Sequence, residues 1–175
     1  MTTWKIDGAH SDIGFKVKHL VISTVRGRFT EYESTISYPE EDLTQASISF
    51  TAQTKSITTG NKGRDEHLRS GDFFNSSEFP TLTFTSTSIT KSSDTKFTVK
   101  GNLTMKSTTH EVVLDTTFNG IAVGMDGNRV ASFEISSTLS RQDFGLTWNV
   151  ALETGGVVVS DDIKLDIIAE FKEVK

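Results

Sequence analysis

The 175-residue chain contains no cysteine and only two prolines. Without cysteine, disulfide bridges, thiolate metal sites and thiol nucleophiles are excluded. The chain also has no apolar run near the roughly 18 residues that a membrane-spanning helix needs. What is abundant instead is Phe, Val, Ile and Thr, and a composition rich in aromatic and β-branched residues with little proline favours β-strands.

Positive charge is not concentrated in any part of the chain. The net charge is −5 and the isoelectric point is near 5.4, with Lys and Arg scattered along the sequence. This distribution argues against nucleic acid as the partner, because phosphate backbones are bound by clustered cations. The first residues, Met1–Asp7, contain no apolar signal region. A cytoplasmic location is therefore expected for the sequence as it stands, with a periplasmic or secreted location as the alternative if a signal peptide has been removed.

Apolar and polar residues alternate with a period of two along most of the chain. The alternating runs lie at 13–17, 46–52, 82–84, 97–105, 133–135 and 163–171. Each run predicts a strand with one apolar and one polar face. Turn-forming residues, as at Gly124–Asn128 and Ser160–Asp162, separate the runs. Short strands from end to end predict one antiparallel all-β domain over residues 1–175, either a sandwich or an up-and-down barrel.

Residues 58–80 interrupt this pattern with a stretch rich in charge, glycine and phenylalanine. Within it, Lys62–Arg69 is predicted to form a short helix that Gly71 ends. A long connection of this kind is usually functional or disordered, and its three phenylalanines argue against disorder. We expect the segment to pack over one end of the sheet.

Five sequence blocks occur in a specific order. They are Trp4-Lys5-Ile6-Asp7 with His10-Ser11 and Phe15-x-Val17-x-His19; Gly27-Arg28-Phe29; Arg64-x-x-His67-Leu68 with Asp72-Phe73-Phe74 and Phe79-Pro80; Gly101-Asn102-Leu103-Thr104; and Arg141-x-Asp143-Phe144-Gly145 followed by Gly155-Gly156. In this order the blocks resemble those of the YceI-like family, and the resemblance covers nearly the whole chain.

The resemblance implies an extended lipocalin-like antiparallel β-barrel of about eight strands. It also implies non-catalytic binding, in transport or storage, of a long-chain polyisoprenoid lipid such as a prenyl quinone or a prenyl phosphate. No cofactor is expected besides this ligand, and pairing of two copies as a homodimer is expected on the same grounds. Each buried methylene contributes about 0.8 kcal/mol, so a prenyl tail needs a dry tunnel more than directed contacts. A barrel of eight strands has room for side chains or for one slender ligand.

The apolar lining of such a barrel is predicted from the strand residues on the apolar faces. These residues are Phe15, Val17, Phe29, Ile48, Phe50, Leu82, Phe84, Leu103, Phe133, Ile135, Ile163, Leu165 and Ile167. The alternative for each of them is that it fills a solid core, as most apolar strand residues do.

Seven polar residues in the family-like blocks are candidates for the head-group end. They are Asp7, His10, Arg64, Asp65, His67, Arg141 and Asp143. In one interpretation some of them gather at a barrel mouth, where the arginines pair with phosphate or a histidine donates to a quinone carbonyl. In the other they form an ion-pair and hydrogen-bond network that anchors residues 58–80.

Two other classes of function were weighed against lipid binding. A hydrolase is disfavoured because His10, Ser11 and Asp12 are consecutive, neighbours in a strand point to opposite faces, and no G-x-S-x-G motif occurs; a triad built from distant residues stays open. No metal site is predicted, because the four histidines lack H-x-x-x-H or H-E-x-x-H spacing. A protein-interaction module with a solid core is the remaining alternative. A continuous apolar tunnel would favour the lipid carrier.

Overall fold

The computed structural model describes residues 1–39 and 41–175, most of which lie in β-strands. The strands are β1 (Thr2–Ile6), β2 (Asp12–His19), β3 (Ser23–Phe29), β4 (Tyr32–Tyr38), β5 (Ser47–Gln53), β6 (Ile57–Thr58), β7 (Thr81–Lys91), β8 (Lys96–Met105), β9 (Thr108–Val123), β10 (Arg129–Ser140) and β11 (Val159–Glu173). The helical elements are η1 (Gly8–His10), η2 (Leu43–Gln45), η3 (Thr54–Ser56), α1 (Lys62–Arg69) and η4 (Arg141–Phe144).

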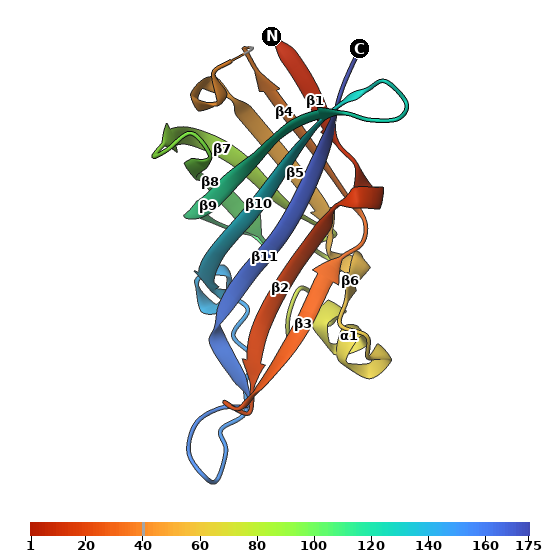
Figure 1. Ribbon diagram of the computed structural model, residues 1–175. Helices are drawn as coiled ribbons and strands as arrows, with labels where there is room; N and C mark the ends of the chain where they lie inside the picture. Colours follow the sequence, from red (N-terminus) through yellow and green to blue (C-terminus); the bar gives the residue numbers. More distant parts are fainter. Residues whose placement is uncertain (40) are drawn as a thin grey trace.

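The strands form one antiparallel sheet that closes on itself (Figure 1). From β1 the order runs β4, β5, β7, β8, β9, β10 and β11, and β11 then pairs with β1. The lower half of β11 pairs with β2, which continues through β3 to β6. The predicted fold class, a closed antiparallel barrel, is confirmed.

Three interruptions explain why eleven strands make an eight-stranded barrel. Both β1 and β2 run along β11, separated by η1. In the same way β4 runs along β1, and β3 runs along β2. On their other side, β5 runs along β4, and β6 runs along β3. Each pair, β1 with β2, β4 with β3 and β5 with β6, is therefore one barrel strand with a break, which gives eight strands as expected from the family resemblance.

The register places the alternating apolar residues on one face, inside the barrel. On β8, Phe97, Val99 and Leu103 are buried. Their neighbours Lys96 and Lys100 are exposed. A strand with period two can bury only one of its faces when the other faces water. The same alternation on the other strands supplies the apolar interior described below.

The connection after β6 covers the end of the barrel away from the chain termini (Figure 1). The helix spans Lys62–Arg69 as predicted, but Ser70 is its C-cap and donates its backbone N–H to His67 O at 3.1 Å. Gly71 comes one residue later and has no positive φ, so its predicted role as the helix end is wrong. No helix among the described residues is long and apolar enough to cross a bilayer.

The predicted turn at Ser160–Asp162 is also wrong, because these residues lie inside β11. Asp161 accepts hydrogen bonds from the Ser140 hydroxyl at 2.6 Å and from the Gln142 backbone N–H at 3.2 Å. These bonds from the end of β10 and from η4 hold the polar run in extended form. Such pairing partners decide whether a segment forms a strand or a turn more strongly than its local composition does.

Candidate functional site

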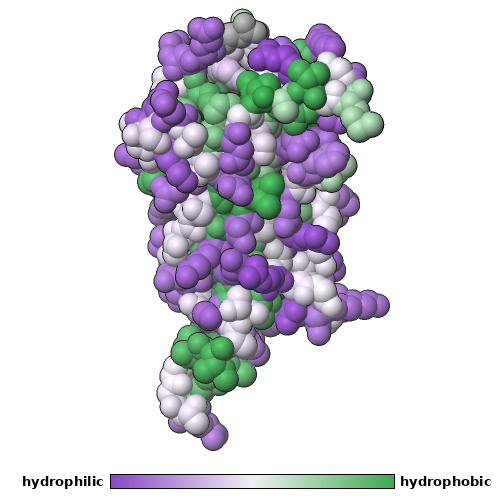
Figure 2. All heavy atoms as spheres, in the orientation of Figure 1, coloured by the Kyte–Doolittle hydropathy of each residue, from purple (hydrophilic) through white to green (hydrophobic). Residues whose placement is uncertain are grey.

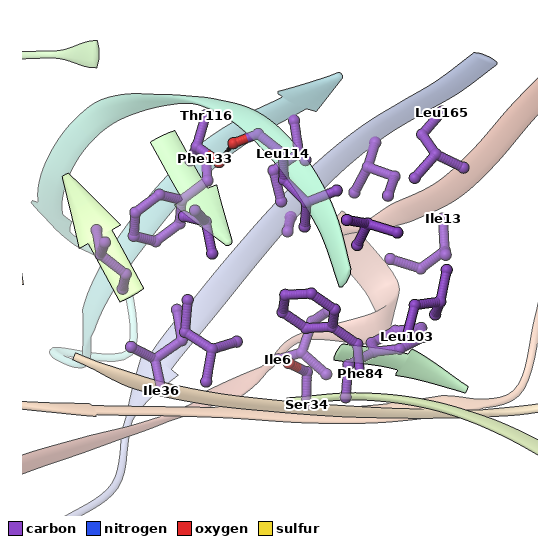
Figure 3. A pocket seen from close by; sticks show the side chains of 18 of the residues that line it. Ile6, Ile13, Ser34, Ile36, Phe84, Leu103, Leu114, Thr116, Phe133 and Leu165 are labelled. Atoms are coloured by element: carbon purple, nitrogen blue, oxygen red, sulfur yellow. Dashed lines mark hydrogen bonds between the residues drawn. The ribbon is translucent and has the colours of Figure 1, made fainter. Parts of the chain in front are cut away.

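An apolar cavity of about 170 Å³ lies inside the barrel near the end that carries both chain termini. We call it the upper cavity. Side chains from ten of the labelled strands, all but β6, line it, among them Ile6, Ile36 and Phe133 (Figure 3). Of the described residues that line it, only Ser34 and Thr116 carry polar side chains. Both hydroxyls donate to backbone carbonyls, at 2.8 Å and 3.4 Å, so this cavity offers a ligand almost nothing but apolar surface.

A second cavity of about 270 Å³ lies at the opposite end of the barrel. This lower cavity shares four lining residues, Phe29, Met105, Leu139 and Leu165, with the upper cavity. The two spaces therefore adjoin along the barrel axis and meet at these four side chains. Together they have the size typical of small-ligand sites, roughly 300–1,000 Å³.

The lower cavity differs from the upper one in its polar lining. The polar residues that line it are Lys18, His19, Thr59, Arg64, His67 and Arg141. Arg64 donates from Nε to Thr59 Oγ1 at 2.7 Å and from Nη2 to Thr59 O at 3.0 Å. No carboxylate in the described residues forms an ion pair with Arg64. Its exposed guanidinium therefore keeps its charge available to a ligand at this mouth.

His67 lies at the same mouth between two aromatic rings. Its ring is 4.6 Å from that of Trp148 and 5.0 Å from that of Phe73, both edge to face. Its Nε2 lies 2.8 Å from a carboxylate oxygen of Asp72. Ring contacts on two sides and a carboxylate on a third give His67 one orientation, with Trp148 and Phe73 both lining the cavity.

Arg141 is buried and donates to backbone carbonyls of the loop that follows it and of the first residues of β11. It donates to the carbonyls of Leu146, Trp148, Val159 and Ser160 at 2.6–3.2 Å. Burial lowers its pKa, an effect that the nearby carboxylate of Asp161 opposes. These bonds join residues 146–148 to the start of β11, so four of the five donors of Arg141 serve the structure.

Asp65 is buried at the start of α1 and binds the segment that enters the helix. It accepts from the Thr59 N–H at 2.7 Å, the Thr59 hydroxyl at 2.6 Å and the Thr58 hydroxyl at 3.1 Å. Burial by itself would raise the pKa of Asp65, but these bonds and the charge of Arg69 together lower it. Asp65 therefore belongs to the network that anchors residues 58–80.

Asp7 and His10 form a separate group at η1, away from both cavity linings. His10 Nδ1 lies 2.9 Å from Asp7 Oδ2 and 3.8 Å from Glu170, and Lys172 Nζ lies 3.1 Å from Asp7 Oδ2. The bond with His10 lowers the pKa of Asp7 and raises that of His10. Asp7, His10 and Glu170 lie close enough to share a metal ion, but the ammonium of Lys172 already supplies the cation there.

The remaining polar candidates do not approach a ligand space. Asp143 is exposed in η4 and lines neither cavity. Ser11, the hydroxyl considered for a hydrolase, exchanges hydrogen bonds with the backbone of Glu170 at 2.9 Å and 3.4 Å. His10 is in η1 and not in a strand as assumed, and it faces Asp7. The polar candidates that have a defined place therefore form three groups: Arg64 and His67 at the lower cavity, Asp65 and Arg141 in the bonds that hold the neighbouring segments, and Asp7 with His10 at η1.

The sequence comparisons place this barrel among known proteins. A family model described as a YceI-like domain matches residues 4–171. The chain belongs to the YceI-like family. A UPF0312 protein from Staphylococcus aureus strain MSSA476 is 39% identical over 172 residues, which are 98% of each chain.

Solved structures share the YceI-like fold over nearly the whole chain. A YceI protein of Campylobacter jejuni is 34% identical with a TM-score of 0.77, covering 97% of this chain and 96% of the other. BcnA of Burkholderia cenocepacia has a TM-score of 0.80 at 20% identity, covering 94% and 98%. A domain of Saccharophagus degradans described as polyisoprenoid-binding has a TM-score of 0.71 at 13% identity, covering 97% of each chain. The last two show the fold alone.

The YceI-like barrel places all the residues predicted to form the apolar lining on a cavity wall. In the upper cavity these are Ile48, Phe50, Leu82, Phe84, Leu103, Phe133, Ile135 and Ile167; in the lower cavity they are Phe15, Val17 and Ile163; Phe29 and Leu165 line both. Contact of these side chains with a ligand stays a prediction. Sequence reasoning did not predict Trp148, Met105 or Lys18 as residues of the cavity wall. Trp148 lies in an irregular loop, Met105 is the last residue of β8, and the alternation places Lys18 on the outer face of β2.

Proposed function

We propose that this YceI-like barrel binds one polyisoprenoid lipid in its two adjoining cavities and performs no chemistry on it. The observation that carries the proposal is the pair of cavities that meet at Phe29, Met105, Leu139 and Leu165. A solid core, as a pure interaction module would have, has no such interior space. The description of the Saccharophagus degradans domain as polyisoprenoid-binding supports the same class of ligand.

The difference between the two linings orients the ligand. The upper cavity has only two hydroxyls, and both are already used by the backbone, so a polar head there would lose its hydrogen bonds to water without replacement. The lower cavity presents Lys18, Arg64 and His67. We therefore assign the prenyl tail to the upper cavity and the head group to the lower one.

The head group is either a phosphate or a quinone, because the lower mouth suits both. The guanidinium of Arg64 complements a phosphate. The same donors, or the ring N–H of His67, complement a quinone carbonyl. Lys18 is held by the hydroxyl of Thr24 at 3.0 Å, on the outer side of the mouth.

Organic extraction of the purified protein followed by mass spectrometry tests the proposal, with heat-denatured protein as the control. We expect a prenyl lipid in roughly equimolar amount that the denatured control does not retain on a desalting column. The head group identified in the spectrum decides between quinone and phosphate. A protein that is empty, and that also fails to take up added prenyl quinones and prenyl phosphates, contradicts the proposal and leaves the barrel fold standing.

A further inference from the structure

Two loops at the lower end of the barrel expose apolar side chains to solvent. Residues 20–22 connect β2 to β3, and residues 150–157 precede β11; together we call them the tip. The exposed fractions are 41% for Leu20, 64% for Val21, 85% for Ile22, 49% for Val150 and 39% for Val157. Figure 2 shows a green, hydrophobic group on the projection below the body of the barrel, with white and purple residues at the far end of the projection.

Two of these exposed residues, Leu20 and Val21, lie in a strained stretch of backbone. Leu20 and Val21 have φ of 54° and 68°, a region that bulky and β-branched residues rarely adopt. The Leu20 N–H donates to Val158 O at 2.9 Å, which ties the two loops together. Strain of this kind costs on the order of 1–3 kcal/mol per residue and persists only where the surrounding structure enforces it. The surrounding structure therefore enforces this backbone conformation, and with it the exposure of the two apolar side chains.

The tip continues directly into the lining of the lower cavity. Lys18 and His19 line the cavity and immediately precede Leu20, while Val158 and Val159 line it and immediately follow Val157. A lipid that leaves the barrel by this mouth therefore emerges beside the tip. Water solvates an apolar chain poorly, so such a chain passes most readily between two apolar environments. For a prenyl lipid, the apolar environment outside the protein is a bilayer.

The composition of the tip favours a bilayer over a second copy of the chain. Its single charged residue is Glu153, so attraction to acidic surfaces is absent and the apolar side chains must supply the affinity. A stable protein–protein interface engages about 20–30 residues on each side. Five apolar side chains on a narrow projection are far below that size, whereas insertion into lipid needs only a few.

We propose that the tip inserts into the surface of a lipid bilayer and holds the lower mouth against it during loading and release of the ligand. The inference rests on the proposed function, because the mouth is useful at a membrane only if the cavity carries a lipid. The one charged residue of the tip, Glu153, and the charged residue next to it, Lys18, have opposite signs. The docking is therefore expected to depend little on salt.

Flotation with phosphatidylcholine vesicles tests the docking. The test variant is Val21→Asn with Ile22→Ser, because asparagine accepts positive φ and so removes apolar surface without adding strain. The matched control is Val123→Ser with Met125→Ser, which removes residues exposed to 70% and 109% at the β9–β10 turn, at the other end of the barrel. We expect the tip variant to lose about tenfold in vesicle partitioning, and the control to partition like the wild type, in low and high salt.

Three outcomes overturn the docking proposal. The wild type fails to float; both double variants lose binding equally; or the tip variant changes the sedimentation mass of the protein while vesicle binding is unchanged, which would assign the tip to a second copy. Extraction of the same preparations reports the cargo separately. A wild type that carries lipid but ignores vesicles contradicts the docking alone, and one that neither carries nor takes up prenyl lipid contradicts the proposed function.

Discussion

Arg64 and Arg141 show at the level of single residues how partners decide what a charge does. Both come from family-like blocks and both line the lower cavity. Arg141 is 3% exposed and donates to four carbonyls, whereas the guanidinium of Arg64 is exposed and, among the described residues, donates to Thr59 alone. A guanidinium has five N–H donors in a fixed geometry, so the four bonds to carbonyls leave Arg141 at most one donor for a ligand. Of the two, Arg64 is the head-group candidate.

Replacing Arg64 with glutamine is expected to weaken binding of a prenyl phosphate about tenfold and to leave a prenyl quinone within about twofold. The loss arises because the charge-assisted bond to the phosphate disappears, while the amide can still donate to a carbonyl. Quenching of Trp148 fluorescence on titration measures both affinities, since its ring lies beside the mouth. Lys62→Gln, at an exposed position on the same helix, is the control. Equal losses for both ligands would contradict the assignment.

Two glycines in the family-like blocks have a packing reason that single side chains make plain. A Cβ at Gly27 would lie 2.4 Å from Cζ of Phe15, and one at Gly101 would lie 2.4 Å from Cζ of Phe84. Each phenylalanine ring lies across a glycine of the neighbouring strand and reaches the cavity wall. Any side chain at these two glycines would displace the ring and change the shape of the cavity.

Asp7→Asn is expected to lower the free energy of unfolding more near about pH 5.5 than near about pH 8.5. The pKa of Asp7 is lowered, so its contribution is present above its unfolded pKa and is lost as the pH falls. The pKa of His10 is raised, so its contribution is full below its unfolded pKa and is lost as the pH rises through the folded value. Both contributions therefore overlap between about pH 4 and 6.5.

Urea denaturation at the two pH values measures this difference. The effect of Asp7→Asn should shrink at the higher pH without vanishing, because Lys172 stays charged and still faces position 7. A His10→Gln variant should remove most of the pH dependence. If the cost of Asp7→Asn is the same at both pH values, the ion pair with His10 contributes nothing to stability.

Among the elements, α1 shows how a short helix is held in place. The Asn61 side chain accepts from the Arg64 N–H at 2.9 Å and caps the helix. Asp65 ties its first turn to Thr58 and Thr59, and Arg69 donates from its last turn to the carbonyls of Lys55 and Ile57 at 2.8 Å and 3.2 Å. A helix of eight residues is not stable alone, so these contacts and the buried phenylalanines that follow determine its position.

Asp65→Ala is expected to reduce the free energy of unfolding by about 1–3 kcal/mol, because it leaves partly buried donors of Thr58 and Thr59 without an acceptor. It should also loosen α1 and the mouth, so Trp148 fluorescence should change before global unfolding in a urea titration. Glu66→Ala, on the exposed face of the same helix, is the matched control and should cost less than about 0.5 kcal/mol. Equal effects at the two positions would show that Asp65 does not anchor the segment.

At the scale of the whole molecule, closure of the sheet is what creates the interior space. The pairing of β1 with β11 joins the two ends of the chain and completes the barrel. The breaks at η1 and between the other paired strands let the barrel extend along its axis. The two cavities then meet at a junction of four side chains, of which Leu165 is only partly buried and so has room beside it.

Leu165→Trp is expected to fill the junction and to lower affinity for a long prenyl lipid at least tenfold, with little loss for a short-chain analogue that occupies one cavity. Ile168→Trp is the matched control, because it lies on the same strand at 49% exposure and on the outer face. Titration with prenyl quinones of increasing length measures the effect. A chain-length dependence that is unchanged in Leu165→Trp would show that the ligand does not cross the junction.

The sequence by itself was enough for the all-β class and for thirteen of the residues that line the two cavities. Period-two alternation records which face of each strand is buried, and that information is local to each run. For the same reason α1 was predictable from its own residues. The YceI-like blocks added the closure of the barrel and the expectation of a lipid, which alternation does not contain.

Only the tertiary structure decided which polar residues share a site. Asp7 and Arg64 belong to equally recognisable blocks, yet one binds at η1 and the other lies at the lower mouth. Their separation follows from how the strands are broken and paired, and such long-range pairing leaves no trace in local sequence. The same holds for the tip, because residues 20–22 and 150–157 meet only after β2 and β11 have paired. Alternation in the sequence specifies which face of each strand is buried, while closure of the sheet decides which residues become neighbours.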